Sequence, residues 1–176
     1  MKTLFAVLCG LIALAAVGGS PAEASVIVYN VTLTGTQSVP SNASTATGFA
    51  TVTVDDVANS VSVDLSFTGL LGGNASAAHI HCCVLTTANG PVVIPFGGFP
   101  AATSGTYSNV FPNVSVANIQ GIEGGLAYIN IHNAVFPGGE IRGNILSAVP
   151  EPSSIALIGI GLVFLGVGSR RLRGIC

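Results

Sequence analysis

The sequence predicts an all-β, antiparallel fold, either a sandwich or a barrel, for the central part of the chain. Its short segments are rich in Val, Ile, Thr and aromatic residues, which often alternate with polar residues as half-buried strands require. Clusters of Gly, Pro, Asn and Ser, such as those at 71–74 and 136–139, separate the segments and indicate tight turns. No stretch within 25–147 has convincing helical periodicity, so we expect strands alone in this region.

About nine segments carry the strand pattern, each bounded by turn residues at a spacing typical of antiparallel sheets. The first is rich in Val and Thr, and the second and third alternate Val, Ala or Leu with Thr, Ser or Asp on either side of the turn at 58–60. The fourth and fifth lie on either side of the turn at 88–91, and the last two flank the turn at 136–139. We predict the strands at residues 26–36, 49–55, 61–68, 78–85, 92–96, 104–110, 114–117, 126–133 and 141–146.

The N-terminal end of the chain is apolar. The 176 residues are 49% hydrophobic and 7% charged, whereas an ordinary domain is about 25% charged. Residues 1–24 contain Lys2, an apolar run over 4–17, and small residues at Ala22 and Ala24. This order is typical of a cleavable secretory signal peptide with its signal peptidase site at Ala22 and Ala24. An uncleaved anchor helix is the alternative, which we disfavour because the apolar run is short.

The C-terminal end has a different order of features. It consists of Pro150, Glu151 and Pro152, an apolar segment at about 153–169, and then Arg170, Arg171 and Arg173. At about 1.5 Å per residue, about 17 residues give a helix of about 25 Å, near the lower limit for crossing a bilayer. Because positive flanks stay in the cytoplasm, we predict a transmembrane helix with cytoplasmic arginines and a preceding domain that faces outward.

Residues 148–176 resemble the PEP-CTERM sorting signal of Gram-negative bacteria. The resemblance implies that the precursor is held transiently in the inner membrane, with its domain in the periplasm, and that an exosortase recognises the segment around Pro150, Glu151 and Pro152. It also implies that the mature protein is then released or transferred to the cell surface or its exopolysaccharide matrix. A tail anchor that is never cut is the alternative, which we disfavour because motif, helix and arginines occur in order.

The domain between the two ends, residues 25–147, has a single basic residue, Arg142. Nucleic-acid binding requires several Lys or Arg side chains to neutralise phosphates, so we expect no nucleic-acid partner. An acidic polysaccharide would have to be held by hydrogen bonds or through a metal ion.

Strand phase places the histidines and the best ionisable groups of the domain on one face. In the predicted strand at 78–85, Ile80 and Cys82 occupy the alternate, apolar positions, so His79 and His81 share the polar face. The same alternation assigns His132 to the polar face of the eighth predicted strand, and Glu140 and Arg142 to that of the ninth. If these strands are neighbours in one sheet, the five side chains share one surface.

These segments resemble the CHRD domain, which is named from chordin and found in many bacterial exported proteins. The residues that carry the resemblance are Gly72-Gly73, Ala78-His79-Ile80-His81, the stretch 127–133 and the stretch 136–144. The resemblance implies an immunoglobulin-like, Greek-key β-sandwich related in shape to copper-zinc superoxide dismutases, and it implies no agreed activity. The sequence departs from the familiar pattern at Cys82-Cys83, where a glycine is more usual.

The three histidines admit two interpretations. A His-x-His pair on a strand places two imidazoles about 7 Å apart on one face, and a third from an adjacent strand would complete a site suited to zinc or copper. The alternative is a polar layer in which His79, His81 and His132 hydrogen-bond across the sheet, to Glu140 or to the backbone. We favour the polar layer and predict no cofactor, and a dismutase-type site needs more than the 3 histidines of this chain.

Glu140 and Arg142 lie two positions apart on one face, which suggests a clamp that holds the conformation or a ligand. We interpret this clamp as structural. The sequence contains no Ser-His-Asp order, no cleft of paired carboxylates and no phosphate-binding loop, so we predict no catalytic residues and no enzyme activity.

Processing at both ends would leave Cys82 and Cys83 as the cysteines of the domain. Adjacent side chains on a strand point to opposite faces, so a bridge between them would require a distorted turn. We therefore predict that Cys82 lies in the core. For Cys83 we predict either an intermolecular disulfide or a soft metal ligand beside His81.

Two function classes follow from these features. The first is a noncatalytic surface or matrix module that is exported, sorted, and associated with exopolysaccharide or another surface protein. The second is a metal-binding extracytoplasmic protein, either a metal-holding domain or a weak oxidoreductase, that uses His79, His81 and His132 to hold zinc or copper. The export signals favour the first class, because they specify a destination without requiring chemistry.

Overall fold

The computed structural model describes residues 26–146. The predicted signal peptide at 1–24, the sorting motif at 150–152, the predicted transmembrane helix at about 153–169 and the arginines at 170–173 lie outside these residues. Within 26–146, the structure contains no helix with the length and apolar character needed to cross a membrane.

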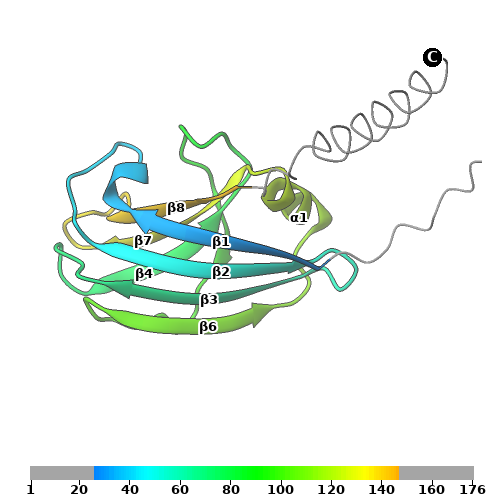
Figure 1. Ribbon diagram of the computed structural model, residues 1–176, viewed down its shortest axis with the longest axis horizontal. Helices are drawn as coiled ribbons and strands as arrows, with labels where there is room; N and C mark the ends of the chain where they lie inside the picture. Colours follow the sequence, from blue (N-terminus) through cyan, green and yellow to red (C-terminus); the bar gives the residue numbers. More distant parts are fainter. Residues whose placement is uncertain (1–25, 147–176) are drawn as a thin grey trace, which may run out of the picture.

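The regular structure of the described residues is mainly β, as predicted. Eight strands form one antiparallel sheet in the order β5-β4-β7-β8-β1-β2-β3-β6 (Figure 1). Strands β5 and β6 are therefore its edges. The strands are β1 (Val26–Thr34), β2 (Thr47–Asp55), β3 (Ser60–Thr68), β4 (Ala75–His81), β5 (Val92–Pro95), β6 (Gly105–Phe111), β7 (Ala127–Asn133) and β8 (Ile141–Ile145).

The sheet curls so that its two halves face each other, in a nearly barrel-like arrangement. Figure 1 shows β1, β2, β3 and β6 in front of β4, β7 and β8. The two halves meet at β1 and β8, which share one register pair, Thr34 with Arg142. Side chains from both halves fill the space between them and are fully buried; among them are Val52, Val63, Ile80, Ile129 and Ile141. This core makes β4, β7 and β8 a rigid platform for the side chains on their other face.

One predicted strand is wrong. In place of a strand at 114–117, the structure has a helix, α1 (Val116–Glu123). The Ser115 hydroxyl caps it by accepting a hydrogen bond from the Asn118 N–H, and Ile119 and Ile122 pack into the core on one side. In a helix of two turns, Ile119 and Ile122 are the only large apolar side chains that are buried, so its periodicity is too short to detect in the sequence.

The bounds of the first and fourth predicted strands also differ from those of the structure. The first strand stops at Thr34, because Gly35–Gln37 form a turn of 3-10 helix. Strand β4 occupies Ala75–His81 rather than 78–85. The alternating pattern that suggested a strand continues through Val84, but the backbone leaves the sheet after His81.

Candidate functional site on strands β4, β7 and β8

Strands β4, β7 and β8 are neighbours in the sheet, which is the condition for the predicted shared surface. The histidines and Arg142 lie on it, whereas the Glu140 carboxylate is bound elsewhere, so the expectation that all five side chains share one surface does not hold for Glu140. The register places His79 opposite Asn130 and His81 opposite Tyr128. It also places Asn130 opposite Arg142. Residues directly opposite one another project to the same face, and this polar face therefore gathers side chains from all three strands.

The polar face is largely covered rather than open to solvent. Tyr128 is 2% exposed, Asn130 is 3% exposed and Arg142 is fully buried. The loop after β4 lies over it, since Arg142 donates hydrogen bonds to two of its carbonyls. The loop after β7 lies over it as well, since the Asn130 amide donates to the Gly138 carbonyl. The alternation of the strands predicted the face, but not this second layer of loops.

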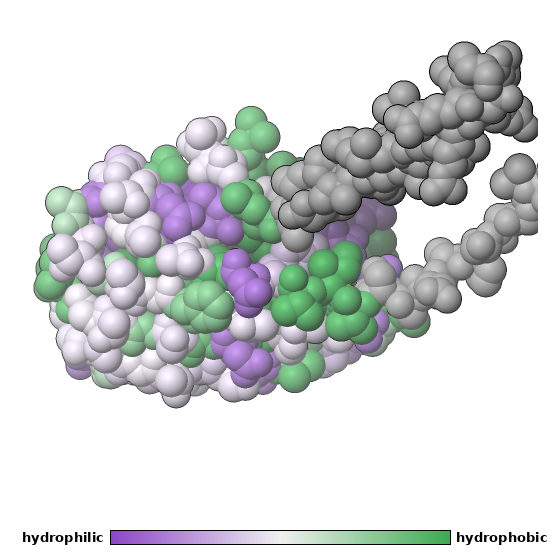
Figure 2. Space-filling model, viewed as in Figure 1, coloured by the Kyte–Doolittle hydropathy of each residue, from purple (hydrophilic) through white to green (hydrophobic). Residues whose placement is uncertain are grey.

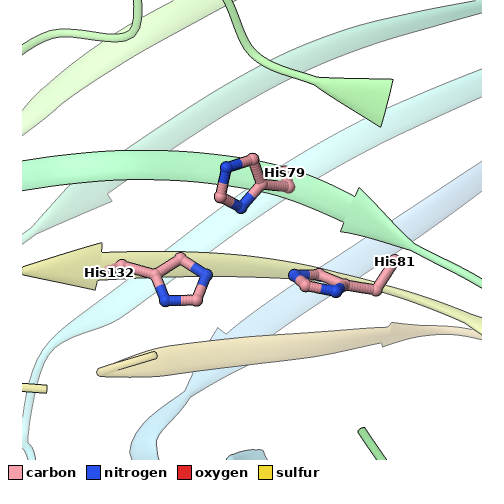
Figure 3. Close-up of side chains that lie close together, drawn as sticks. All are labelled: His79, His81 and His132. Atoms are coloured by element: carbon pink, nitrogen blue, oxygen red, sulfur yellow. The ribbon is translucent and has the colours of Figure 1, made fainter. Parts of the chain in front are cut away.

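The three histidines form a compact cluster on this face. One ring nitrogen of each of His79, His81 and His132 lies within 4.8 Å of the others. The ring centroids are 5.6 Å apart for His79 and His81 and 5.1 Å apart for His79 and His132. Figure 3 shows the rings, two from β4 and one from β7, directed toward the space between them.

Backbone carbonyls fix the orientation of two of these rings. His81 Nδ1 lies 2.9 Å from the Gly90 carbonyl oxygen, and His132 Nδ1 lies 2.9 Å from the Pro137 carbonyl oxygen. A carbonyl oxygen only accepts, so in both rings Nδ1 is the nitrogen that carries the proton. In the neutral ring, Nε2 then has a free lone pair.

Three other ring nitrogens of the cluster have no hydrogen-bond partner. Nδ1 of His79, Nε2 of His81 and Nε2 of His132 are buried and make no hydrogen bond. In the expected polar layer, two ring nitrogens bond to backbone carbonyls and three buried ones have no partner. Three unsatisfied buried ring nitrogens side by side are unusual, because native structures pair nearly all such groups.

The surroundings favour the neutral form of two of the imidazoles. Burial lowers the pKa of His79, and the nearby His132 and His81 lower it further. Burial also lowers the pKa of His81; the hydrogen bond to Gly90 opposes this effect, while His132 and Arg142 add to it. Neutral imidazole is the form that binds metal ions.

Arg142 connects β8 to the loop after β4. Its guanidinium donates to the carbonyls of Thr86 and Ala88, each at 3.0 Å, and its Cζ atom lies 3.4 Å from the centre of the Tyr128 ring. The other neighbour of Tyr128 is His81, whose ring is parallel to it at 4.7 Å. Burial lowers the pKa of Arg142, while Tyr128 raises it. Tyr128 thus separates the histidine cluster from the positive charge.

Glu140 lies at the start of β8 and is fully buried. Its carboxylate accepts hydrogen bonds from the backbone N–H groups of Leu71 and Gly72 and from the side chains of Ser44 and Asn133. Burial alone would raise the pKa of Glu140, but these four hydrogen bonds together lower it. Glu140 therefore joins three distant segments of the chain through one carboxylate.

Glu140 and Arg142 have separate partners. Glu140 holds the loop before β4, whereas Arg142 holds the loop after β4. The hydrogen bonds of the histidine rings go to backbone carbonyls rather than to Glu140. That Glu140 and Arg142 act as a structural clamp stays a prediction. Because the two side chains hold different loops, they would form two clamps rather than one.

Cys82 and Cys83 are bonded to each other, which corrects both expectations for Cys83. The S–S distance is 2.02 Å and the peptide bond between the two residues is cis. Because β4 ends at His81, the alternation that would separate the two side chains no longer applies here. Cys82 is fully buried, as predicted. The bridged sulfur of Cys83 is neither a thiolate ligand nor a partner for a second chain.

Sequence reasoning missed the residues that orient the histidines. Tyr128 stacks on His81 because of the register between β4 and β7, which the sequence alone does not determine. Its hydroxyl also accepts from the Gly90 N–H. The carbonyls of Gly90 and Pro137 carry no signal in their side chains, because any residue type offers the same backbone oxygen.

The fold and the site define a small antiparallel β-domain with a histidine cluster beneath its surface loops. The model of the CHRD domain matches residues 29–145, and the chain belongs to the CHRD domain family. The PEP-CTERM protein-sorting motif matches residues 148–172. Both resemblances identified in the sequence are thereby confirmed. Neither a curated protein nor a solved structure matches the chain.

Proposed function

We propose that this CHRD protein is exported, is sorted by an exosortase to the cell surface or the exopolysaccharide matrix, and has a noncatalytic binding or structural role there. The observation that carries the proposal is the adjacency of the two matches, since the sorting motif at 148–172 begins directly after the domain at 29–145. A domain followed at once by a sorting signal is a cargo of that signal.

The route that we propose begins with cleavage of the signal peptide 1–24 after Ala24. The helix at about 153–169 then holds the precursor in the inner membrane, with Arg170, Arg171 and Arg173 in the cytoplasm. An exosortase acts near Pro150–Pro152, where the two prolines favour the extended conformation that peptidases bind. We also expect the curled sheet to be of the Greek-key type of immunoglobulin and superoxide dismutase domains, as the family resemblance implies.

The outer face of β1, β2, β3 and β6 supports a role in contact with a polymer. The register forms two rows of outward side chains across the four strands: Thr32, Phe49, Ser66 and Thr106 in one, and Asn30, Thr51, Asp64 and Ser108 in the other. Figure 2, which looks onto this side of the molecule, shows mostly pale, weakly polar residues. Hydroxyl groups around one exposed aromatic ring suit a neutral polysaccharide, which needs no basic residues.

Phe49 is the ring at the centre of this face, and it lines two shallow depressions. We expect Phe49→Ala to weaken binding to a soluble neutral glucan by about 3- to 10-fold, because ring stacking contributes about 0.5–1.5 kcal/mol. Affinity gel electrophoresis of the full-length protein measures this. Val57→Ala, at a residue that is 66% exposed in the turn after β2, is the matched control. Equal retardation of both variants and the parent protein would contradict the proposed face.

The sorting proposal is tested in cells that contain an exosortase. We expect a variant with Pro150, Glu151 and Pro152 all changed to Ala to accumulate as a membrane-bound precursor, while the parent protein reaches the surface or the medium in a shorter form. Fractionation and immunoblotting measure both. Asp64→Ala, an exposed change within the domain, should be sorted normally. If the triple variant reached the surface in the processed form, the proposal would be wrong.

The alternative function, metal binding by the three histidines, has separate structural support. It is compatible with sorting, because it uses the opposite half of the sheet and none of residues 148–172.

A further inference from the structure

We propose that His79, His81 and His132 bind one Cu²⁺ or Zn²⁺ ion through Nδ1 of His79 and Nε2 of the other two rings, with a further coordination position open to solvent. This inference goes beyond the sorting role. It also reverses the preference that the sequence alone supports, which is for a polar layer without metal.

The histidine cluster contains buried ring nitrogens that have no hydrogen-bond partner. The three ring nitrogens without a hydrogen bond are the ones that a metal ion would use, and all three are buried. A buried polar atom without a partner costs about 1–3 kcal/mol. Hydrogen bonding within the cluster would satisfy at most some of these atoms, because two acceptor nitrogens have no proton to share. A single cation satisfies all three at once.

The orientation of two of the histidine rings also supports a metal site. In metal sites, a ligating histidine usually donates its other N–H to a carbonyl or carboxylate, which fixes the tautomer. His81 and His132 make this contact with the carbonyls of Gly90 and Pro137. These two bonds put the free lone pairs on Nε2, toward the interior of the cluster. The loops after β4 and β7 thus prepare the rings for a cation.

The distances between the ring nitrogens also support a metal site. The three nitrogens lie within 4.8 Å of one another, whereas ligands of a tetrahedral ion at about 2.0–2.1 Å are about 3.4 Å apart. Small rotations of the side chains close this difference, and the strands need not move. Such a spacing is expected for lone pairs that repel each other until a cation draws them together.

The types of ligand atom in the cluster determine which ions the site accepts. The cluster contains three imidazoles and no carboxylate, since Glu140 is bound to Ser44, Leu71, Gly72 and Asn133. The sulfur of Cys83 is in a disulfide. A neutral nitrogen donor set favours copper and zinc over calcium and magnesium, which prefer oxygen. The order of stability of divalent complexes places Cu²⁺ above Zn²⁺.

Charge and access are compatible with this assignment. Arg142 is the charged group that acts on His81, and it lies behind the Tyr128 ring rather than against the cluster. His79 and His132 are half-buried, so an ion and a water ligand can reach the cluster from their side.

Metal titration of the full-length protein, purified in detergent and stripped with a chelator, tests the proposal. We expect isothermal titration to give one Cu²⁺ or one Zn²⁺ per chain, with Cu²⁺ bound more tightly, and no binding of Mg²⁺ or Ca²⁺ at the same concentrations. Loss of an outer hydrogen bond weakens metal sites by about 10–100-fold, so loss of a ligand in His79→Ala, His81→Ala or His132→Ala should weaken binding by at least about 100-fold.

Two further variants distinguish loss of a ligand from loss of fold. In His81→Asn and His132→Asn, the amide nitrogen replaces the Nδ1–H donor to Gly90 or Pro137, but the Nε2 lone pair is absent. We expect them to keep the circular dichroism spectrum of the parent protein and to lose the metal. Stoichiometric metal in the folded Asn variants, or no metal in the folded parent protein, would overturn the proposal and leave the sorting proposal intact.

Discussion

Replacing Glu140 with Ala lowers the free energy of unfolding by about 3–5 kcal/mol, the largest loss expected from a single change in the described part of the chain. The carboxylate is fully buried and accepts from Ser44, Leu71, Gly72 and Asn133. Its removal leaves the donors of Gly72 and Asn133, whose hydrogen bonds are buried, without an acceptor, and hydrogen bonds to a charged group contribute about 1.5–3 kcal/mol each. Urea denaturation followed by circular dichroism measures the change.

The control for this variant is Asp64→Ala. Asp64 is exposed and accepts a hydrogen bond from the Ser108 hydroxyl, so its loss should change the stability by about 0.5 kcal/mol or less. Similar losses in the two variants would show that the hydrogen bonds to Glu140 do not hold the loops as described.

The acid dependence of stability gives a second measurement on Glu140. Its pKa in the folded state is below the ordinary value of 4.5. At pH values between these two pKa values, the unfolded chain binds a proton that the folded chain does not. The stabilisation is present above 4.5 and decreases as the pH falls through the interval. Glu140→Gln has no such proton, and the part of the acid dependence due to Glu140 should disappear in it.

Replacing Arg142 with Met lowers the free energy of unfolding by about 3 kcal/mol and releases the loop after β4. The change removes the hydrogen bonds to the Thr86 and Ala88 carbonyls and the contact with the Tyr128 ring. Because Gly90 belongs to the same loop and orients His81, metal binding should weaken as well. Denaturation measures the stability, and hydrogen exchange of residues 82–91 measures the release of the loop.

Arg142→Lys is the matched control, since it keeps the positive charge but not the planar group of donors. We expect a loss between those of the parent protein and the Met variant. Unchanged hydrogen exchange in the loop of the Met variant would contradict this role of Arg142.

The alternation of the sequence was sufficient to predict the strands that carry the site and the face on which it lies. His79 and His81 share a face because they are two residues apart, and this follows from strand geometry alone. His132 and Arg142 lie on the same face as His79 and His81 because of the strand order β4-β7-β8. Alternation along one strand does not determine which strands are neighbours.

The errors and omissions have physical causes. Helix α1 is too short for its periodicity to be detected, and its apolar pair, Ile119 and Ile122, also suits a strand or a loop. The alternation continued past the end of β4, so the bridge between Cys82 and Cys83 was disfavoured. The preference for a polar layer required a partner for every ring nitrogen, and only three-dimensional contacts reveal that three nitrogens have none.

A crystal structure of the zinc-loaded protein, with anomalous scattering recorded at the zinc edge, tests whether the three histidines on neighbouring strands form one metal centre. We expect a single strong peak about 2.0–2.1 Å from Nδ1 of His79, Nε2 of His81 and Nε2 of His132. A map without a peak between these rings, or with zinc held elsewhere on the domain, would contradict it.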